Sequence, residues 1–151
     1  MGKTLYTVQD FEKYLKQKQD DFNFYRKNGL ENVNQKLIEF GRTLGVFPDV
    51  WKVKSNRVKG CTSNVFIHLD ISNGKIILNG HSDSEIVKGQ LAILINGLNM
   101  LSPQEIVFQT EQILNNFVNN TDVRFSMTIS RANSLGTLYL FIKNKVEEYL
   151  N

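Results

Sequence analysis

The pair Asn73-Gly74 constrains the fold of this chain more than any other feature of its sequence. Asn-Gly favours a two-residue β-hairpin loop, because a type I′ turn needs positive φ at both central residues. Apolar and polar residues alternate over residues 65–71 before the pair, and a second strand-like run covers residues 75–81. A two-residue loop places Leu69 opposite Leu78, on the face expected to meet the core.

Helical patterns come before the hairpin. Apolar residues at helical spacing predict helices over residues 8–18 and 31–44, and Thr7 is the expected N-cap of the first. A polar segment, residues 17–28, is expected to connect the two helices. Gly45 follows the second helix and is expected to help end it.

Helical patterns also follow the hairpin. Ser82 and Glu85 form a capping box that is expected to open a helix containing Gly89. A glycine inside a helix costs about 1 kcal/mol relative to alanine, so Gly89 indicates close approach by another backbone segment. Residues 102–105 form a second capping box with proline at the first helical position. Ser130 is the expected cap of the last helix.

Strands and helices are therefore segregated along the chain. This order predicts an α+β fold, in which helices pack on one face of a small antiparallel sheet of about three strands. The third strand is expected near residues 57–59, just before the hairpin. A chain of 151 residues is expected to form one domain, residues 1–151.

Composition limits the classes of function. The formal net charge of +3 is too small to indicate nucleic-acid binding by itself. No apolar run approaches the roughly 20 residues that a membrane span needs. The single cysteine fits a reducing compartment, because thiols stay free there. The expected location is the cytoplasm for a bacterial protein, with a plastid-type organelle as the alternative after loss of a transit peptide.

Cys61 is the candidate reactive residue, because a lone thiol can act as a nucleophile or carry a transferable group. Gly60 allows a sharp turn before it, and Ser63 is compatible with a loop that enters a strand. Lys59 and Arg57 supply positive charge, which stabilises a thiolate. The alternative reading is a buried structural thiol that packs as a small hydrophobe.

Three further charged or metal-binding candidates lie along the chain. Arg131 falls at the expected N-terminus of the last helix, where the helix dipole disfavours a cation. It is read either as a solvated arginine or as a group held there to meet an anion. His68 and His81 are diagonal neighbours in the predicted register, and with Cys61 they offer three zinc ligands without a convincing fourth. We therefore predict no metal site and read both histidines as exposed-face strand residues.

Four sequence blocks together resemble the SufE family of sulfur-acceptor proteins. Residues 58–66 (VKGCTSNVF) are similar to the loop and strand of that family, and residues 82–89 (SDSEIVKG) and 130–135 (SRANSL) are similar to two of its helix starts. Residues 38–44 (IEFGRTL) are similar to its second helix. The blocks follow the order of the family from about residue 30 to the end, whereas residues 1–29 look like a more variable N-terminal helix and connector.

The resemblance implies a SufE-like and IscU-like fold and a specific role. A partner cysteine desulfurase (SufS-like) forms a persulfide on its own cysteine, and Cys61 accepts that sulfur and passes it to an iron–sulfur scaffold complex (SufB-like). Arg131, Gly60, Lys59 and Ser63, singled out above by their positions and charges, are expected to support Cys61 in this role. Partner docking is expected from three charged side chains: Asp83, Lys88 and Arg57.

The same resemblance implies a sulfurtransferase-like carrier rather than a stand-alone enzyme. No cofactor of its own is expected, because pyridoxal phosphate resides on the desulfurase. The main alternative is a module that activates the desulfurase without covalent sulfur transfer. An iron–sulfur scaffold of the IscU type is disfavoured by the single cysteine. A cysteine hydrolase would need His68 or His81 as a base next to Cys61.

Overall fold

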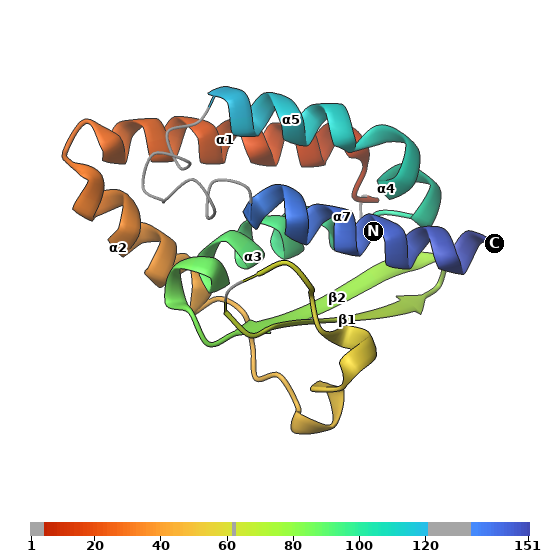
Figure 1. The fold of residues 1–151 in the computed structure, drawn as a ribbon. Helices are drawn as coiled ribbons and strands as arrows, with labels where there is room; N and C mark the ends of the chain where they lie inside the picture. The colour runs from red at the N-terminus through yellow and green to blue at the C-terminus, as the bar shows by residue number, and fades with distance from the viewer. Residues whose placement is uncertain (1–4, 62, 121–133) are drawn as a thin grey trace, which may run out of the picture.

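The computed structural model describes residues 5–61, 63–120 and 134–151, with only the backbone described at residues 30, 31 and 134. Within these residues the fold is α+β, as predicted (Figure 1). The elements are α1 (Val8–Arg26), α2 (Leu30–Gly41), the short 3₁₀ turns η1 (Asp49–Trp51) and η2 (Lys54–Asn56), β1 (Val65–Ser72), β2 (Lys75–Ser82), α3 (Glu85–Leu98), α4 (Pro103–Gln109), α5 (Glu111–Asn120) and α7 (Ser134–Leu150).

The helices cover one face of the hairpin. In Figure 1, α3 and α7 lie next to the sheet, and α1 and α5 lie side by side on the outer side of these two helices. The segment that contains η1 and η2 lies on the opposite side of the sheet. The buried core runs between the inner sheet face and the helices, with Ile67, Ile76 and Leu91 at its centre.

The hairpin has the predicted register. Leu69 pairs with Leu78 and Ile71 pairs with Ile76 across an antiparallel ladder. The turn residues Asn73 and Gly74 have φ values of 52° and 76°, the positive values that a type I′ turn needs. Side chains that alternate along both strands therefore divide into a face toward the helices and a face toward η1 and η2.

The expected third strand is smaller than predicted. Within the described residues it is reduced to one isolated bridge between Arg57 and Phe66, and the sheet has two strands. Val58 N–H donates to Val65 O at 2.9 Å, after which the chain turns away through Gly60, whose φ is +90°. The early turn leaves no length for a full strand on this edge of the sheet.

The other edge of the sheet is covered by the segment that follows α3. Ile76 N–H donates to Leu101 O at 2.8 Å, and Met100 N–H donates to Ile76 O at 2.9 Å. Asn99 adds a side-chain acceptor, because its Oδ1 takes the N–H of Leu78 at 2.6 Å. These bonds satisfy backbone groups that an open strand edge would expose.

The first helix is longer than predicted. The segment expected to be a connector, residues 17–28, is helical as far as Arg26, because its apolar residues continue the buried face of α1. Phe22 on this stretch is only 3% exposed. The predicted cap Thr7 is confirmed and forms a capping box with Asp10. The Tyr14 hydroxyl donates to Ile93 O at 3.0 Å and ties α1 to α3.

The crossing of α2 and α3 confirms the close approach predicted at Gly89. An ideal Cβ built on Gly89 would clash with the carbonyl oxygen of Leu37. A Cβ on Gly41, on the other helix, would lie 3.0 Å from the backbone nitrogen of Gly89. The two backbones therefore touch at this crossing, and only glycine fits on either side.

The cap of α3 differs from the prediction. Ser84 is the N-cap, and its Oγ accepts the N–H of Val87 at 3.3 Å. Ser82, the predicted cap, still belongs to β2, and its Oγ instead accepts the N–H of Ser84 at 3.1 Å. The strand thus keeps its last residue, and the helix begins after two connecting residues.

The connection after α3 contains the second predicted capping box, which is confirmed. Ser102 and Glu105 cap α4 reciprocally, with Pro103 at the first helical position. No single described helix is long and apolar enough to cross a membrane, and α3 with α4 passes that test of length and composition only as a pair bent by 114°. α5 continues through Asn120, the last residue described before the gap.

The last helix, α7, turns apolar residues toward the core. Leu135, Leu138 and Ile142 recur at helical spacing and are at most 4% exposed. Tyr149 is 61% exposed, because it lies near the end of α7 beyond the core. The predicted cap Ser130 lies outside the described residues.

Candidate functional site

The loop that carries Cys61 is held at its base by backbone pairing. Val58 N–H donates to Val65 O at 2.9 Å, and Arg57 forms an isolated bridge with Phe66. Val58 itself is only 2% exposed and packs into the core. The loop therefore leaves and re-enters the sheet at fixed points, and Cys61 lies between them.

A chain of polar contacts strengthens this base. The Arg57 guanidinium donates to Asn64 Oδ1 at 2.8 Å, and Asn64 N–H donates to Asp83 Oδ1 at 3.1 Å. Asp83 N–H donates back to Asn64 O at 3.2 Å. Two residues assigned to partner docking, Arg57 and Asp83, are thus joined through Asn64, which was not among the predicted site residues. Asn64 lies directly before β1, within the block 58–66 that resembles the family loop, and that block is the sequence signal that could have pointed to it.

Cys61 itself is half-buried. It follows Gly60, whose φ of +90° makes the sharp turn that the sequence predicted, and its side chain packs against the hydrophobic core. Burial raises the pKa of the Cys61 thiol, because the apolar surroundings disfavour the thiolate. At rest the thiol is therefore shielded and held in its neutral, less reactive form.

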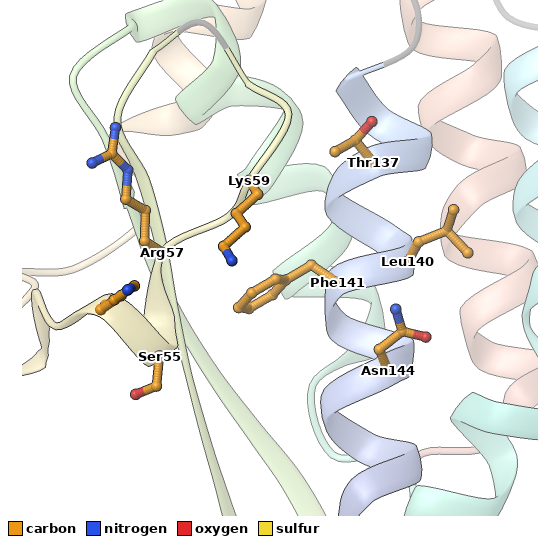
Figure 2. Close-up of a pocket in the computed structure, with 8 residues that line it drawn as sticks. Ser55, Arg57, Lys59, Thr137, Leu140, Phe141 and Asn144 are labelled. Carbon is orange, nitrogen blue, oxygen red and sulfur yellow. The ribbon is translucent and has the colours of Figure 1, made fainter.

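The expected lowering of the Cys61 pKa by Lys59 and Arg57 is not found among the described residues. Within the described part of the chain, desolvation is the only cause that acts on the pKa of the thiol, and it raises the pKa. Arg57 turns its guanidinium away from α7 to Asn64, and Lys59 extends toward Phe141 (Figure 2). Neither cation is therefore directed at the thiol. Their proximity to Cys61 in sequence did not predict their effect on its pKa for this reason.

Ser63 has an unusual environment for a polar residue. Its Oγ is buried and has no hydrogen-bond partner within the described part of the chain. A buried hydroxyl without a partner costs free energy, because its hydrogen bonds to water are lost and not replaced. Ser63 lies two residues after Cys61, so this unpaired donor belongs to the same loop as the thiol.

A groove of about 710 Å³ runs beside the loop (Figure 2). One wall carries the cationic residues Lys54, Arg57 and Lys59, and the other is α7, where Leu140 and Phe141 line it. Thr137 of α7 also lines the groove, and an ideal Cβ on Gly60 would lie 3.7 Å from its Cγ2. The groove therefore runs close to Gly60, the residue that precedes Cys61.

The remaining docking candidate, Lys88, lies on the first turns of α3. It is close enough to His81 to help lower the pKa of that imidazole, although burial is the larger cause and Lys52 acts alongside it. Asp83 acts on His81 in the opposite direction. Asp83 and Lys88 therefore lie around His81 at the junction of β2 and α3.

Neither histidine is an ordinary exposed strand residue, contrary to the prediction. The imidazole of His68 stacks on Trp51 with ring centroids 3.8 Å apart and planes 3° apart. His81 stacks on Phe47 at 6.1 Å. Both rings are half-buried under the segment that contains η1, a cover that the alternation of the strands did not reveal.

The described residues do not support metal or hydrolase chemistry at the thiol. No three His, Cys, Asp or Glu side chains among them lie close enough to hold a metal ion. Neither histidine is among the influences on the pKa of the Cys61 thiol. Arg131 lies outside the described residues, so its assigned supporting role stays a prediction.

Comparison with known proteins gives one family match and several relatives. The SufE family profile, described as an Fe-S metabolism associated domain, matches residues 17–146. An uncharacterized SufE-like protein of Synechocystis sp. is 34% identical over 122 residues, which cover 81% of this chain and 74% of that protein.

A second relative and one solved structure agree with this match. The cysteine desulfuration protein SufE of Plasmodium falciparum is 32% identical over 119 residues, covering 76% of this chain but only 45% of that protein. The solution structure of a hypothetical protein from Thermus thermophilus has a TM-score of 0.70 at 24% identity. It covers 91% of this chain and 96% of its own, and it supports the fold. The family profile and the Synechocystis relative together show that this chain belongs to the SufE family.

Proposed function

We propose that this protein accepts sulfur from a cysteine desulfurase and carries it as a persulfide on Cys61 for iron–sulfur cluster assembly. The observation that carries the proposal is the position of Cys61, half-buried in a loop whose two ends are held by Val58 and Val65. Family membership supports the same role, since the profile is described as associated with Fe-S metabolism. The name of the Plasmodium falciparum relative adds cysteine desulfuration.

The proposed transfer is a nucleophilic displacement at sulfur. The thiolate of Cys61 attacks the terminal sulfur of the desulfurase persulfide, and a new S–S bond forms on Cys61 as the old one breaks. The thiolate of the desulfurase cysteine leaves with the electron pair of the broken bond. The proton lost by Cys61 balances the proton that the leaving thiolate later takes up. No net oxidation occurs, so the step needs no further reactant.

The half-buried thiol fits a carrier that reacts only with its partner. Burial raises the pKa of Cys61, which slows side reactions of the free protein. Docking moves the loop tip out of the core, and the exposed thiol then ionises more readily. Ser63 supports this step, because its unpaired hydroxyl is a donor available to the thiolate once the tip has moved.

The partners and compartment follow from the same proposal. The desulfurase supplies pyridoxal phosphate, and this chain acts as a sulfurtransferase-like carrier that hands its sulfur to a scaffold complex. Asp83, Arg57 and Lys88 contribute to docking, with Asp83 and Arg57 also holding the base of the loop. A reducing compartment, such as bacterial cytoplasm or a plastid, keeps the single thiol free.

Intact-mass spectrometry tests the proposal directly. The protein is incubated with the cysteine desulfurase of the same organism and L-cysteine, and Cys61→Ser is run beside it. We expect a mass gain of one sulfur atom that reductant removes and that Cys61→Ser lacks. No gain in mass, with desulfurase turnover still raised, overturns the carrier in favour of a non-covalent activator. The observation that favours this second function is the half-buried thiol with its raised pKa, because a structural cysteine has the same properties.

A further inference from the structure

The groove between the Cys61 loop and α7 combines positive charge with an apolar wall. Lys54, Arg57 and Lys59 line one side, although the Arg57 guanidinium turns away to Asn64, and no described Asp or Glu lines the groove. Neither Lys54 nor Lys59 forms an ion pair with a described residue. The two lysines therefore leave positive charge on this wall that an anion bound in the groove would neutralise.

The opposite wall offers apolar contact. Leu140 on α7 is 50% exposed, which is unusual for a leucine beside a hollow in the surface, and Phe141 next to it is partly buried. Lys59 and Phe141 extend toward each other from the two walls (Figure 2). A ligand for this groove therefore needs both carboxylates and a bulky apolar side chain.

The groove also lies at the thiol loop. Thr137 lines it, and its Cγ2 would lie 3.7 Å from an ideal Cβ on Gly60, so this wall runs close to the residue before Cys61. A segment bound in the groove would contact Lys59, which adjoins Gly60 in the loop. Binding here is thus placed to move the loop tip, whose base stays held by Val58 and Val65.

We propose that this groove binds an acidic segment of the cysteine desulfurase, anchored by one bulky apolar side chain. The proposal rests on the proposed function for the identity of the partner, and on charge complementarity for the chemistry of the segment. A protein segment fits better than a nucleic acid, because the net charge of the chain is only +3 and one wall of the groove is apolar. The bound segment would bring the persulfide of the desulfurase beside Cys61.

Calorimetric titration with the purified desulfurase, without L-cysteine, tests the groove. The groove variants are Lys54→Glu and Leu140→Asp, both at exposed positions. The matched controls are Lys13→Glu on α1 and Phe108→Asp on α4, which are exposed and lie outside the groove. We expect each groove variant to weaken binding about five- to tenfold and each control to bind like the wild type. Added salt should weaken wild-type binding more steeply than Lys54→Glu binding.

The readouts separate this proposal from the proposed function. Circular dichroism checks the fold of each variant, and loading of Cys61 by inorganic polysulfide checks its thiol without any partner. Groove variants that bind the desulfurase like the wild type overturn the groove proposal and leave the persulfide assay to judge the carrier. Wild type that gains no sulfur overturns the carrier, while the titration still decides the groove. Variants that lose affinity for the scaffold complex alone overturn the desulfurase as the occupant.

Discussion

The crossing of α2 and α3 and the loop that carries Cys61 both depend on a glycine, but the two glycines have different surroundings. At Gly89 an added methyl group would meet the backbone of Leu37, which has nowhere to move. At Gly60 the nearest described atom beyond the adjacent residues is Thr137 Cγ2 at 3.7 Å, an ordinary van der Waals distance. Packing thus fixes the crossing, whereas the loop tip is constrained by its backbone angle and has room around it.

Hydrogen bonding shows the same contrast over a shorter distance. At the base of the loop, Asn64 bonds to both Arg57 and Asp83. At the tip, the Ser63 hydroxyl is buried without a partner among the described residues, and Cys61 is half-buried as a neutral thiol. The polar groups at the base of the loop are hydrogen-bonded, and they hold its two ends in place. The Ser63 hydroxyl at the tip is not, so it would gain a hydrogen bond if the tip moved.

Gly89→Ala should produce the largest effect, because it adds an atom where the two helix backbones touch. We expect the free energy of unfolding to fall by about 3 kcal/mol, at the upper end of what overpacking costs. Urea denaturation measures it. The matched control is Gly45→Ala, where an added Cβ has nothing within 4 Å. A loss at Gly89 as small as that at Gly45 would mean that the crossing is not fixed by packing.

Asp83→Ala should have the next largest effect, because it removes the acceptor for Asn64 N–H at the base of the loop. We expect a loss of about 1 kcal/mol in stability and, if loop opening carries that loss, about fivefold faster alkylation of Cys61 at neutral pH. Iodoacetamide labelling followed by mass spectrometry measures the rate. Asp83→Asn keeps an oxygen acceptor and should stay close to the wild type.

Asp70→Ala is the control for this prediction. Asp70 is an exposed aspartate on β1, outside the loop. Faster alkylation in Asp70→Ala would assign the change to lost negative charge in general. Equal alkylation rates for Asp83→Ala and wild type would contradict the prediction. They would mean that the hydrogen bonds at the base of the loop do not help to shield Cys61.

Most of the fold could be predicted from the sequence, because its signals are local. Asn73-Gly74 fixes a turn through backbone angles, and the register of the hairpin follows from it. Thr7 and Ser102 cap helices through contacts three residues away. The prediction failed where distant packing decides the outcome, as in the continuation of α1 through Phe22 and the cover of His68 by Trp51.

The site could be predicted only in part, for the same reason. Cys61 and Gly60 lie in the turn that the sequence indicated, and the family resemblance was correct. The direction of the Cys61 pKa shift was wrong, because it depends on burial by the core rather than on the charges nearest in sequence. Asn64 and the groove wall formed by α7 depend on contacts between segments far apart in the chain. The spacing of apolar residues along the sequence does not reveal such contacts.

Burial of Cys61 should also make the free energy of unfolding depend on pH, with a smaller effect than the two substitutions above. The raised pKa of Cys61 means that the folded state binds this proton more tightly than the unfolded chain does. The stability from the neutral thiol is fully present below the unfolded pKa of about 8.5, and it is lost as the pH rises through the higher folded pKa. Cys61→Ser should therefore lose less stability than wild type as the pH rises above the unfolded pKa of the thiol.

Urea denaturation across this range measures the difference, and ionisation of the tyrosines cancels between the two proteins. The alkylation rate of Cys61 gives an independent check, because its midpoint should lie above the pKa of an ordinary cysteine. A midpoint below that value would place a cation at the thiol and make the tip a pre-ionised site. The contrast with the satisfied base would then disappear.

Ser63→Ala should change the free energy of unfolding least of these variants. It is therefore the most specific test of the difference between the base and the tip of the loop. The hydroxyl has no partner to lose in the described structure, so the free energy of unfolding should stay within about 0.5 kcal/mol of the wild type. Sulfur transfer from the desulfurase should nevertheless slow, because the variant lacks the donor that meets the thiolate when the tip moves. Single-turnover mass spectrometry measures the transfer rate. Ser72→Ala, at an exposed position on β1, is the control and should leave both quantities unchanged.

The combination of these two results is what separates a functional from a structural role for Ser63. A serine kept for packing or hydrogen bonding in the resting loop would lower stability when removed, and transfer would slow only as far as the loop unfolds. A serine kept for the moved state leaves stability intact and slows transfer alone. Unchanged transfer in Ser63→Ala would remove this hydroxyl from the mechanism, and the mobility of the tip would then rest on Gly60 and Cys61.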